Sequence, residues 1–115
     1  MDVTSIIVSF EDCAKKQYHF TLEGNWRKGN EQVKKMNELF ARIKDHGDEA
    51  RNKLLDLTNS NSDEVASMAA VYSMRFNPEK CLKTLQGIAE KNIPLLSSDA
   101  KQAIENWNNK EWYID

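Results

Sequence analysis

Apolar side chains recur every three or four residues along nearly the whole chain, and this spacing restricts it to helices. Between residues 3 and 20, for example, Val3, Ile7, Phe10 and Ala14 fall on one helical face. No segment shows the period of two that a half-buried strand requires. Four glycines and two prolines leave few positions where a helix must break. The sequence therefore predicts an all-α protein.

Capping residues set the expected limits of the first three helices. The first helix should fade around Gly24-Asn25. We expect the second to begin at Asn30, because an Asn side chain can accept a backbone hydrogen bond at a helix start. Gly47 is the expected residue just after its end, since glycine readily adopts the left-handed conformation found there. A shorter third helix should follow from about Asp48.

Three more helices are expected in the second half. A polar run at residues 58–62 predicts a turn, after which Asn61 and Glu64 form the pattern of a capping box. Asn77-Pro78 predicts the start of the fifth helix, with Pro at its first position. The apolar segment 93–96 should bury its leucines, and Ser98 or Asp99 should open the sixth helix. About six helices with short links favour three antiparallel hairpins.

The two cysteines are expected to be core residues. Cys13 and Cys81 belong to no Cys-x-x-Cys pair, and both coincide with apolar stripes. Cys81 lies near a predicted helix start, where the helix dipole favours a reactive thiolate, but a nucleophile also needs a neighbouring base. Its register with Leu82, Leu85 and Ile88 instead predicts burial, in a protein kept in a reducing compartment.

The motifs of common catalytic and metal sites are missing from the sequence. Its two histidines, His19 and His46, are far apart, and no His-Glu-x-x-His or Cys-x-x-Cys motif occurs. The glycines are scattered and none follows a predicted strand, so a nucleotide-binding loop has no basis. We therefore expect no enzyme activity, no metal and no cofactor.

Charge and hydropathy restrict the class of partner. The net charge is -2, and the Lys-Lys and Arg-Lys doublets are interleaved with acidic residues, which favours neither DNA nor RNA. Apolar runs are too short to span a membrane, and no secretion signal is recognisable. A cytoplasmic protein that binds another protein is the expected class.

Four segments carry a resemblance to a known family. They are residues 46–55 (HGDEARNKLL), 61–74 (NSDEVASMAAVYSM), 77–82 (NPEKCL) and 93–100 (IPLLSSDA). Together they resemble the bacterial family of short HEAT-like proteins known as domain of unknown function 2019, over roughly residues 3–107. The resemblance implies a HEAT-like α-α layered right-handed superhelix. It brings no catalytic residues.

The domain organisation expected from this likeness is one HEAT-like domain over residues 1–115. Residues 108–115 would form an aromatic tail, and this tail departs from the family pattern. Some small helical proteins of the same type serve as immunity partners of toxins. The resemblance is thus more specific for fold than for function.

The resulting functional hypothesis is an immunity protein. It would neutralise a toxin of contact-dependent growth inhibition, a nuclease being one candidate, by covering the toxin's active site. A HEAT-like adaptor unrelated to toxins is the alternative. The expected partner-binding residues are Asp56, Asp63, Glu64, Trp112, Tyr113 and Asp115. The two aromatic residues either fold back over the last hairpin or stand exposed as interface anchors, which Trp and Tyr often are.

Overall fold

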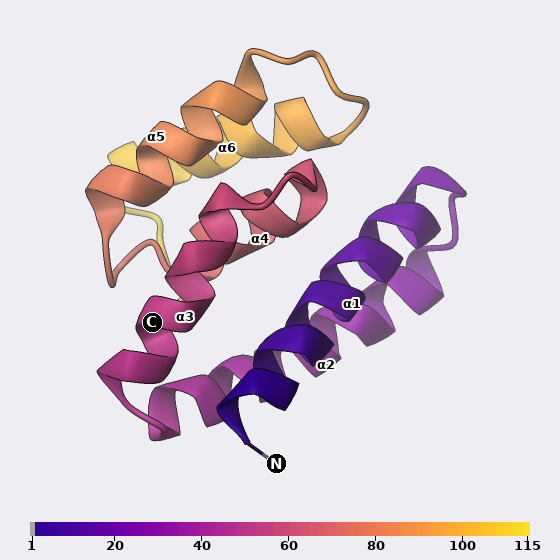
Figure 1. The fold of residues 1–115 in the computed structure, drawn as a ribbon. Helices are drawn as coiled ribbons and strands as arrows, with labels where there is room; N and C mark the ends of the chain where they lie inside the picture. Colours follow the sequence, from indigo (N-terminus) through magenta and orange to yellow (C-terminus); the bar gives the residue numbers. More distant parts are fainter. Residues whose placement is uncertain (1) are drawn as a thin grey trace. The chain divides into compact units, whose positions relative to one another are not determined.

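The computed structural model describes residues 2–115, and these are folded mainly into helices (Figure 1). The elements are α1 (Val3–Leu22), α2 (Trp26–Asp45), α3 (Asp48–Asp56), a short 3-10 helix η1 (Leu57–Asn59), α4 (Asp63–Tyr72), α5 (Pro78–Ala89) and α6 (Leu96–Asn108). No strand occurs in this part of the chain. The predicted all-α class with six α-helices is confirmed. None of these helices is long and apolar enough to cross a lipid bilayer.

Backbone contacts divide the chain into two compact units. The first ends at Leu54 and the second begins at Leu55, so that the division falls inside α3. Each unit has its own pair of packed helices, α1 with α2 in the first and α5 with α6 in the second. The single HEAT-like domain and its right-handed superhelix remain predictions, because they concern how such units are arranged.

The α1–α2 hairpin forms the first unit's core (Figure 1). Its buried apolar residues are Ile6, Ile7, Phe10, Cys13 and Ala14 on α1, and Met36, Leu39, Phe40 and Ile43 on α2. Gly24, with φ of 76°, reverses the chain after α1. Asn25 Oδ1 then accepts a hydrogen bond from Lys28 N at 3.2 Å and caps α2. The predicted start at Asn30 is therefore wrong by about one turn.

Gly29 lies inside α2, although a glycine weakens a helix interior. A Cβ atom at this position would lie 3.2 Å from Thr21 Oγ1 of α1. Thr21 is fixed there because its hydroxyl donates to the carbonyl oxygen of Gln17 at 2.8 Å. The glycine thus permits a close approach of α1 and α2 and does not end a helix.

In the second unit α4 packs against η1, α5 and α6. The fully or nearly fully buried side chains include Val65, Ala69, Met74, Cys81, Leu85, Ile88, Leu96 and Ala100. The predicted burial of Cys81 and Leu85 is confirmed. Asn77 Oδ1 accepts from Lys80 N at 3.1 Å and Pro78 occupies the first turn, so the predicted start of α5 is also right.

The start of α4 differs from the predicted one. Ser62, not Asn61, is the N-cap residue, and its side chain makes no hydrogen bond to the helix backbone. Its hydroxyl donates instead to Glu64 Oε1 at 2.5 Å, so the predicted capping box does not form. The helix ends at Tyr72 and is followed by turns through Phe76.

The α5–α6 connection contains a tight turn at Leu95. Leu95 has φ of 63°, and Leu96 N donates to Pro94 O at 2.7 Å, the hydrogen bond of a strained γ-turn. Because of this turn α6 starts at Leu96, earlier than the predicted Ser98 or Asp99. Leu96 is buried as expected, whereas Leu95 is 40% exposed and contradicts the expectation.

Candidate functional site

All six predicted contact residues lie in the second unit, in two groups. Asp56 ends α3, and Asp63 and Glu64 begin α4. Trp112, Tyr113 and Asp115 belong to the aromatic tail, residues 108–115, of which Asn108 is still the last residue of α6. The two grooves that the tail helps to line include no member of the acidic group.

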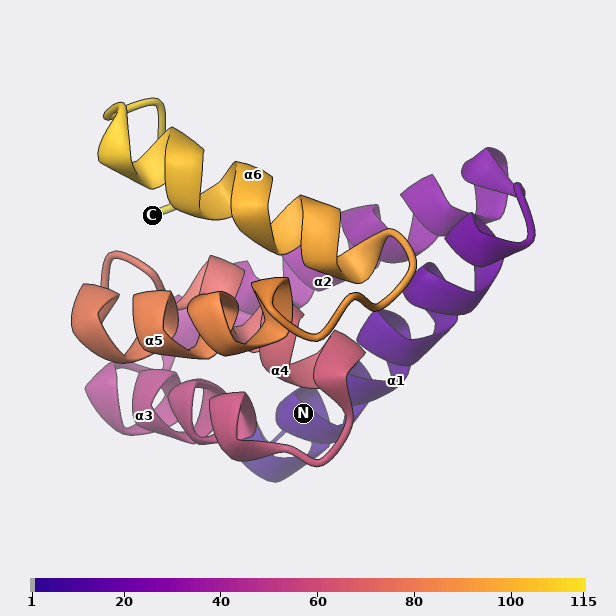
Figure 2. The same ribbon diagram turned by 90° about the horizontal axis from the view of Figure 1, so that it is seen from above.

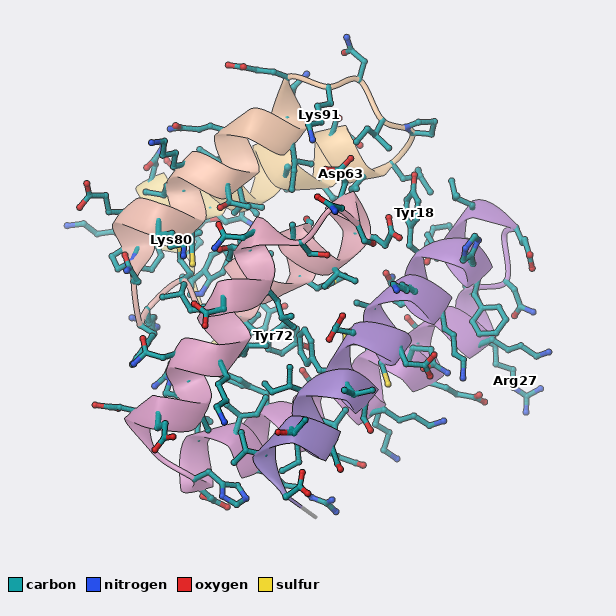
Figure 3. All side chains as sticks on the ribbon, in the orientation of Figure 1. Tyr18, Arg27, Asp63, Tyr72, Lys80 and Lys91 are labelled. Carbon is teal, nitrogen blue, oxygen red and sulfur yellow. The ribbon has the colours of Figure 1, made fainter. Side chains whose placement is uncertain are left out.

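The acidic group is partly neutralised. Asp63 Oδ1 lies 2.7 Å from Lys91 Nζ, which reaches across from the end of α5 (Figure 3). Glu64 accepts a hydrogen bond from Ser62. The pairing with Lys91 reduces the field that Asp63 can exert on an approaching partner. This group is therefore a weaker candidate for electrostatic attraction than its sequence suggests.

The aromatic tail turns back after α6 (Figure 2). It is held by a distant arginine. Lys110, with φ of 60°, makes the reversal, and Glu111 N donates to the carbonyl oxygen of Asn106 at 2.9 Å. The guanidinium of Arg75 donates from Nη2 to Trp112 O at 2.6 Å and from Nε to Ile114 O at 3.1 Å. These bonds fix the backbone on both sides of residue 113.

Trp112 and Tyr113 have different environments although they are adjacent. Trp112 is half-buried and packs edge-to-face on Trp107, with ring centroids 5.9 Å apart and an interplanar angle of 80°. Tyr113 is 88% exposed. Of the two roles considered for the tail, covering the helix describes Trp112, and exposure describes Tyr113.

A groove of about 250 Å³ lies beside Tyr113, within the second unit. It is lined by Val71, Asp99, Gln102, Ala103, Asn106, Glu111, Trp112, Tyr113 and Ile114. Two of these residues are acidic, and no Lys or Arg is among them. Burial raises the pKa of the Asp99 carboxyl above its usual value, as expected for a partly desolvated acid. The groove is suited to a cationic group, which would offset that desolvation.

The cysteines are poorly suited to nucleophilic chemistry. Burial raises the pKa of Cys81 to about 12, and burial together with Asp12 raises that of Cys13. Because the thiolate is the reacting species, a raised pKa makes both thiols less reactive at neutral pH than an exposed cysteine. Within residues 2–115 no group of three or more His, Cys, Asp or Glu side chains is placed to hold a metal ion.

Sequence reasoning missed Arg75, Asp99 and Glu111. Arg75 is 37 and 39 residues away from its two carbonyl acceptors, so no local pattern identifies it. Asp99 was assigned only to a helix start, and Glu111 was not singled out. The sequence did contain a weak signal. Three consecutive large apolar residues, Trp112, Tyr113 and Ile114, indicate that the tail packs on another part of the chain.

Comparison with known proteins gives a fold and no activity. No family model matches the chain, and no curated protein matches it. The crystal structure of the protein RPA1889 from Rhodopseudomonas palustris CGA009 is similar, with a TM-score of 0.90 and 18% sequence identity. The match covers 100% of this chain and 95% of that one. The chain thus shares a helical fold with that protein, and at this identity the likeness concerns the fold alone.

Proposed function

We propose that the chain is a protein-binding module of the short HEAT-like type and acts as an immunity protein. It would neutralise a toxin of contact-dependent growth inhibition in the cytoplasm by covering the toxin's active site, with no catalytic residue or cofactor of its own. The observation that supports this most directly is Tyr113, 88% exposed on a backbone held by Arg75.

A tyrosine held in this way is well suited to anchor an interface. Tyr and Trp side chains contribute most to many interfaces because they offer a large contact area with few rotatable bonds. The hydrogen bonds from Arg75 flank Tyr113, so little backbone entropy remains to be lost on binding. Trp112 packs on Trp107 and supports the same segment from the side of the helix.

The adjoining groove indicates the charge of the partner. Asp99 and Glu111 line it together with Tyr113, and no basic residue does. A partner that inserts an Arg or Lys side chain would place a cation between these carboxylates and beside an aromatic ring, both of which attract it. A nuclease toxin has a basic surface where it holds phosphates, and it would fit this arrangement.

The proposal is tested by co-expressing the chain with the toxin domains encoded beside its gene. One of these should be neutralised, and the purified pair should form a complex. Tyr113→Ala should weaken that complex by roughly 30-fold or more, the size of an interface hot spot of about 2 kcal/mol. The melting temperature of the unbound Tyr113→Ala protein should stay within about 1–2 °C of that of the wild type, as for ordinary surface substitutions.

Trp26→Ala is the matched control, because Trp26 is also an exposed aromatic residue, at 64%, but belongs to the first unit. It should leave the affinity unchanged. If no toxin is neutralised, the immunity function is wrong. A non-toxin partner that loses affinity with Tyr113→Ala would then establish the adaptor alternative, whereas equal effects of both substitutions would remove the tail from the interface.

A further inference from the structure

A second pocket next to the aromatic tail has the opposite electrostatic character. It measures about 330 Å³ and is lined by Arg75, Trp107, Lys110 and Trp112. Two of these residues are cations and two are indoles, and none of the four side chains contains a hydrogen-bond acceptor. No carboxylate is among the described side chains that line it. The pocket therefore combines positive charge with donors only.

The indole N–H of Trp112 is enclosed without a hydrogen-bond partner. Its Nε1 atom is the single side-chain nitrogen or oxygen within residues 2–115 that is buried and unpaired. Buried donors in folded proteins nearly always have an acceptor, so an orphaned one calls for an explanation. The Trp112 ring makes an edge-to-face contact with the ring of Trp107.

The positive charge of Arg75 is not neutralised by its bonds to the tail. Its two acceptors, Trp112 O and Ile114 O, are neutral carbonyl oxygens. A guanidinium carries five N–H donors, of which these bonds use two. Lys110 follows α6 in the reversed, positive-φ conformation and contributes the second cation. An anion in this pocket would thus meet two positive charges, next to the residue that carries the unpaired donor.

We propose that the pocket formed by Arg75, Trp107, Lys110 and Trp112 binds an oxyanion, the carboxylate or phosphate group of a ligand. Arg75 and Lys110 balance the charge of the anion, and a small shift of the Trp112 ring lets its enclosed Nε1–H donate to one oxygen of the anion. A volume of about 330 Å³ holds such a group with a small substituent against the indole rings. This inference does not depend on the proposed immunity function, because it uses neither Tyr113 nor the acidic groove.

The test is an NMR titration of the ¹⁵N-labelled protein that follows its three tryptophan indole N–H signals. Sodium phosphate and sodium acetate are the two probes, and sodium chloride at the same ionic strength is the control. We expect a saturable shift of the Trp112 indole signal with at least one probe and none with chloride. Saturation by phosphate alone identifies a phosphate ligand, and saturation by acetate alone a carboxylate. A Trp112 signal that moves with neither probe overturns the proposal.

Two substitutions check which atoms bind the anion. Trp112→Phe keeps an aromatic ring but removes the donor, and it should weaken binding at least about tenfold when followed at the Trp107 indole. Lys110→Gln should weaken binding severalfold. Lys101→Gln is the matched control, since Lys101 is an exposed residue of α6 that does not line the pocket.

Unchanged affinity in Trp112→Phe, in a spectrum that is otherwise folded, contradicts the proposal. So does an equal loss in Lys110→Gln and Lys101→Gln, because it would reveal general charge attraction without a site. If Trp112→Phe fails to fold, the two lysine variants and the Trp112 signal itself still decide the question.

Discussion

The stripe of α5 and the aromatic tail are both fixed in the second unit, but by different forces. On α5, Cys81, Leu85 and Ile88 are buried at helical spacing, and each loses its exposure through packing alone. The tail has no such stripe, and it is held by two hydrogen bonds from Arg75 and by the contact of Trp112 with Trp107. Core packing is distributed over many atoms, whereas the tail depends on a few contacts, of which those of Arg75 fix its backbone. Core substitutions should therefore change global stability, and Arg75 substitutions should release the tail alone.

Leu85→Ala should have the largest effect. The side chain is 0% exposed, and truncation of a buried leucine costs about 2–5 kcal/mol through lost packing and a residual cavity. Urea unfolding followed by circular dichroism measures the change. Val8→Ala is the control, because Val8 is 58% exposed and should change stability by no more than about 0.5 kcal/mol. A loss below that level for Leu85→Ala would mean that α5 does not depend on this stripe.

Alkaline pH should destabilise the same stripe by a somewhat smaller amount. Burial raises the pKa of Cys81 from 9.0 to about 12, so the unfolded chain loses this proton at lower pH than the folded one. Stability is therefore intact below about pH 9 and falls as pH rises toward 12, by on the order of 2 kcal/mol at pH 10.5. Urea unfolding between pH 7 and 10.5 measures it.

Tyr72 adds to the alkaline effect in the same direction. Burial, with a further contribution from Tyr113, raises the pKa of Tyr72 from 10.0 to about 12. The loss of stability that Tyr72 causes therefore begins above pH 10. In Cys81→Ala the decline should consequently start about one pH unit later than in the wild type. An identical pH profile in the two proteins would show that Cys81 is not shielded from solvent.

Arg75→Ala should free the tail at a cost of about 1 kcal/mol in global stability, the scale of hydrogen bonds made at an exposed site. The backbone amides of the tail should then exchange with solvent deuterium faster, while those of α1 and α2 keep their rates. Arg75→Lys retains the charge but lacks the planar fork that reaches both carbonyls, so it should be intermediate. Faster exchange throughout the chain would contradict the distinction between stripe and tail.

Leu95→Gly should have the smallest effect and the opposite sign. Relief of the positive-φ strain, about 1–2 kcal/mol, is partly offset by the greater freedom of glycine in the unfolded chain, roughly 0.5–1 kcal/mol. A net gain of about 0.5 kcal/mol is expected from thermal unfolding. Leu95→Ala also removes most of the side chain but keeps Cβ, which causes the strain at positive φ. Its stability should therefore not increase. Equal stability changes in both variants would mean that the turn carries no strain.

The helices could be predicted where the signal is local. Asn77 and Pro78 specify a helix start by themselves, because cap and first turn are adjacent in the sequence. The start of α2 could not be predicted in this way. Asn25 and Asn30 have the same capping side chain, so residue type cannot choose between them, and the structure places the cap at Asn25. The tight turn at Leu95, which precedes α6, has no residue of the usual turn types at that position.

The candidate site was only partly predictable. Trp112 and Tyr113 could be selected by residue type, but their separate environments follow from Trp107 and Arg75, which lie 5 and 37 residues away from Trp112. Asp63 has an acidic side chain in any conformation, yet its pairing with Lys91 arises only when α4 and α5 pack together. Neither contact leaves a trace in residue spacing.

By itself the sequence determined the all-α class, the buried stripe of α5 and the burial of both cysteines. These features depend on apolar residues that recur at helical spacing, and such residues are close together in the sequence. Only the tertiary structure decided the start of α2 at Trp26 and of α6 at Leu96, the hydrogen bonds from Arg75 to the tail, and the two pockets of opposite charge. Those features join residues that are distant in sequence, and the free energy of such contacts exists only once the chain has closed around them.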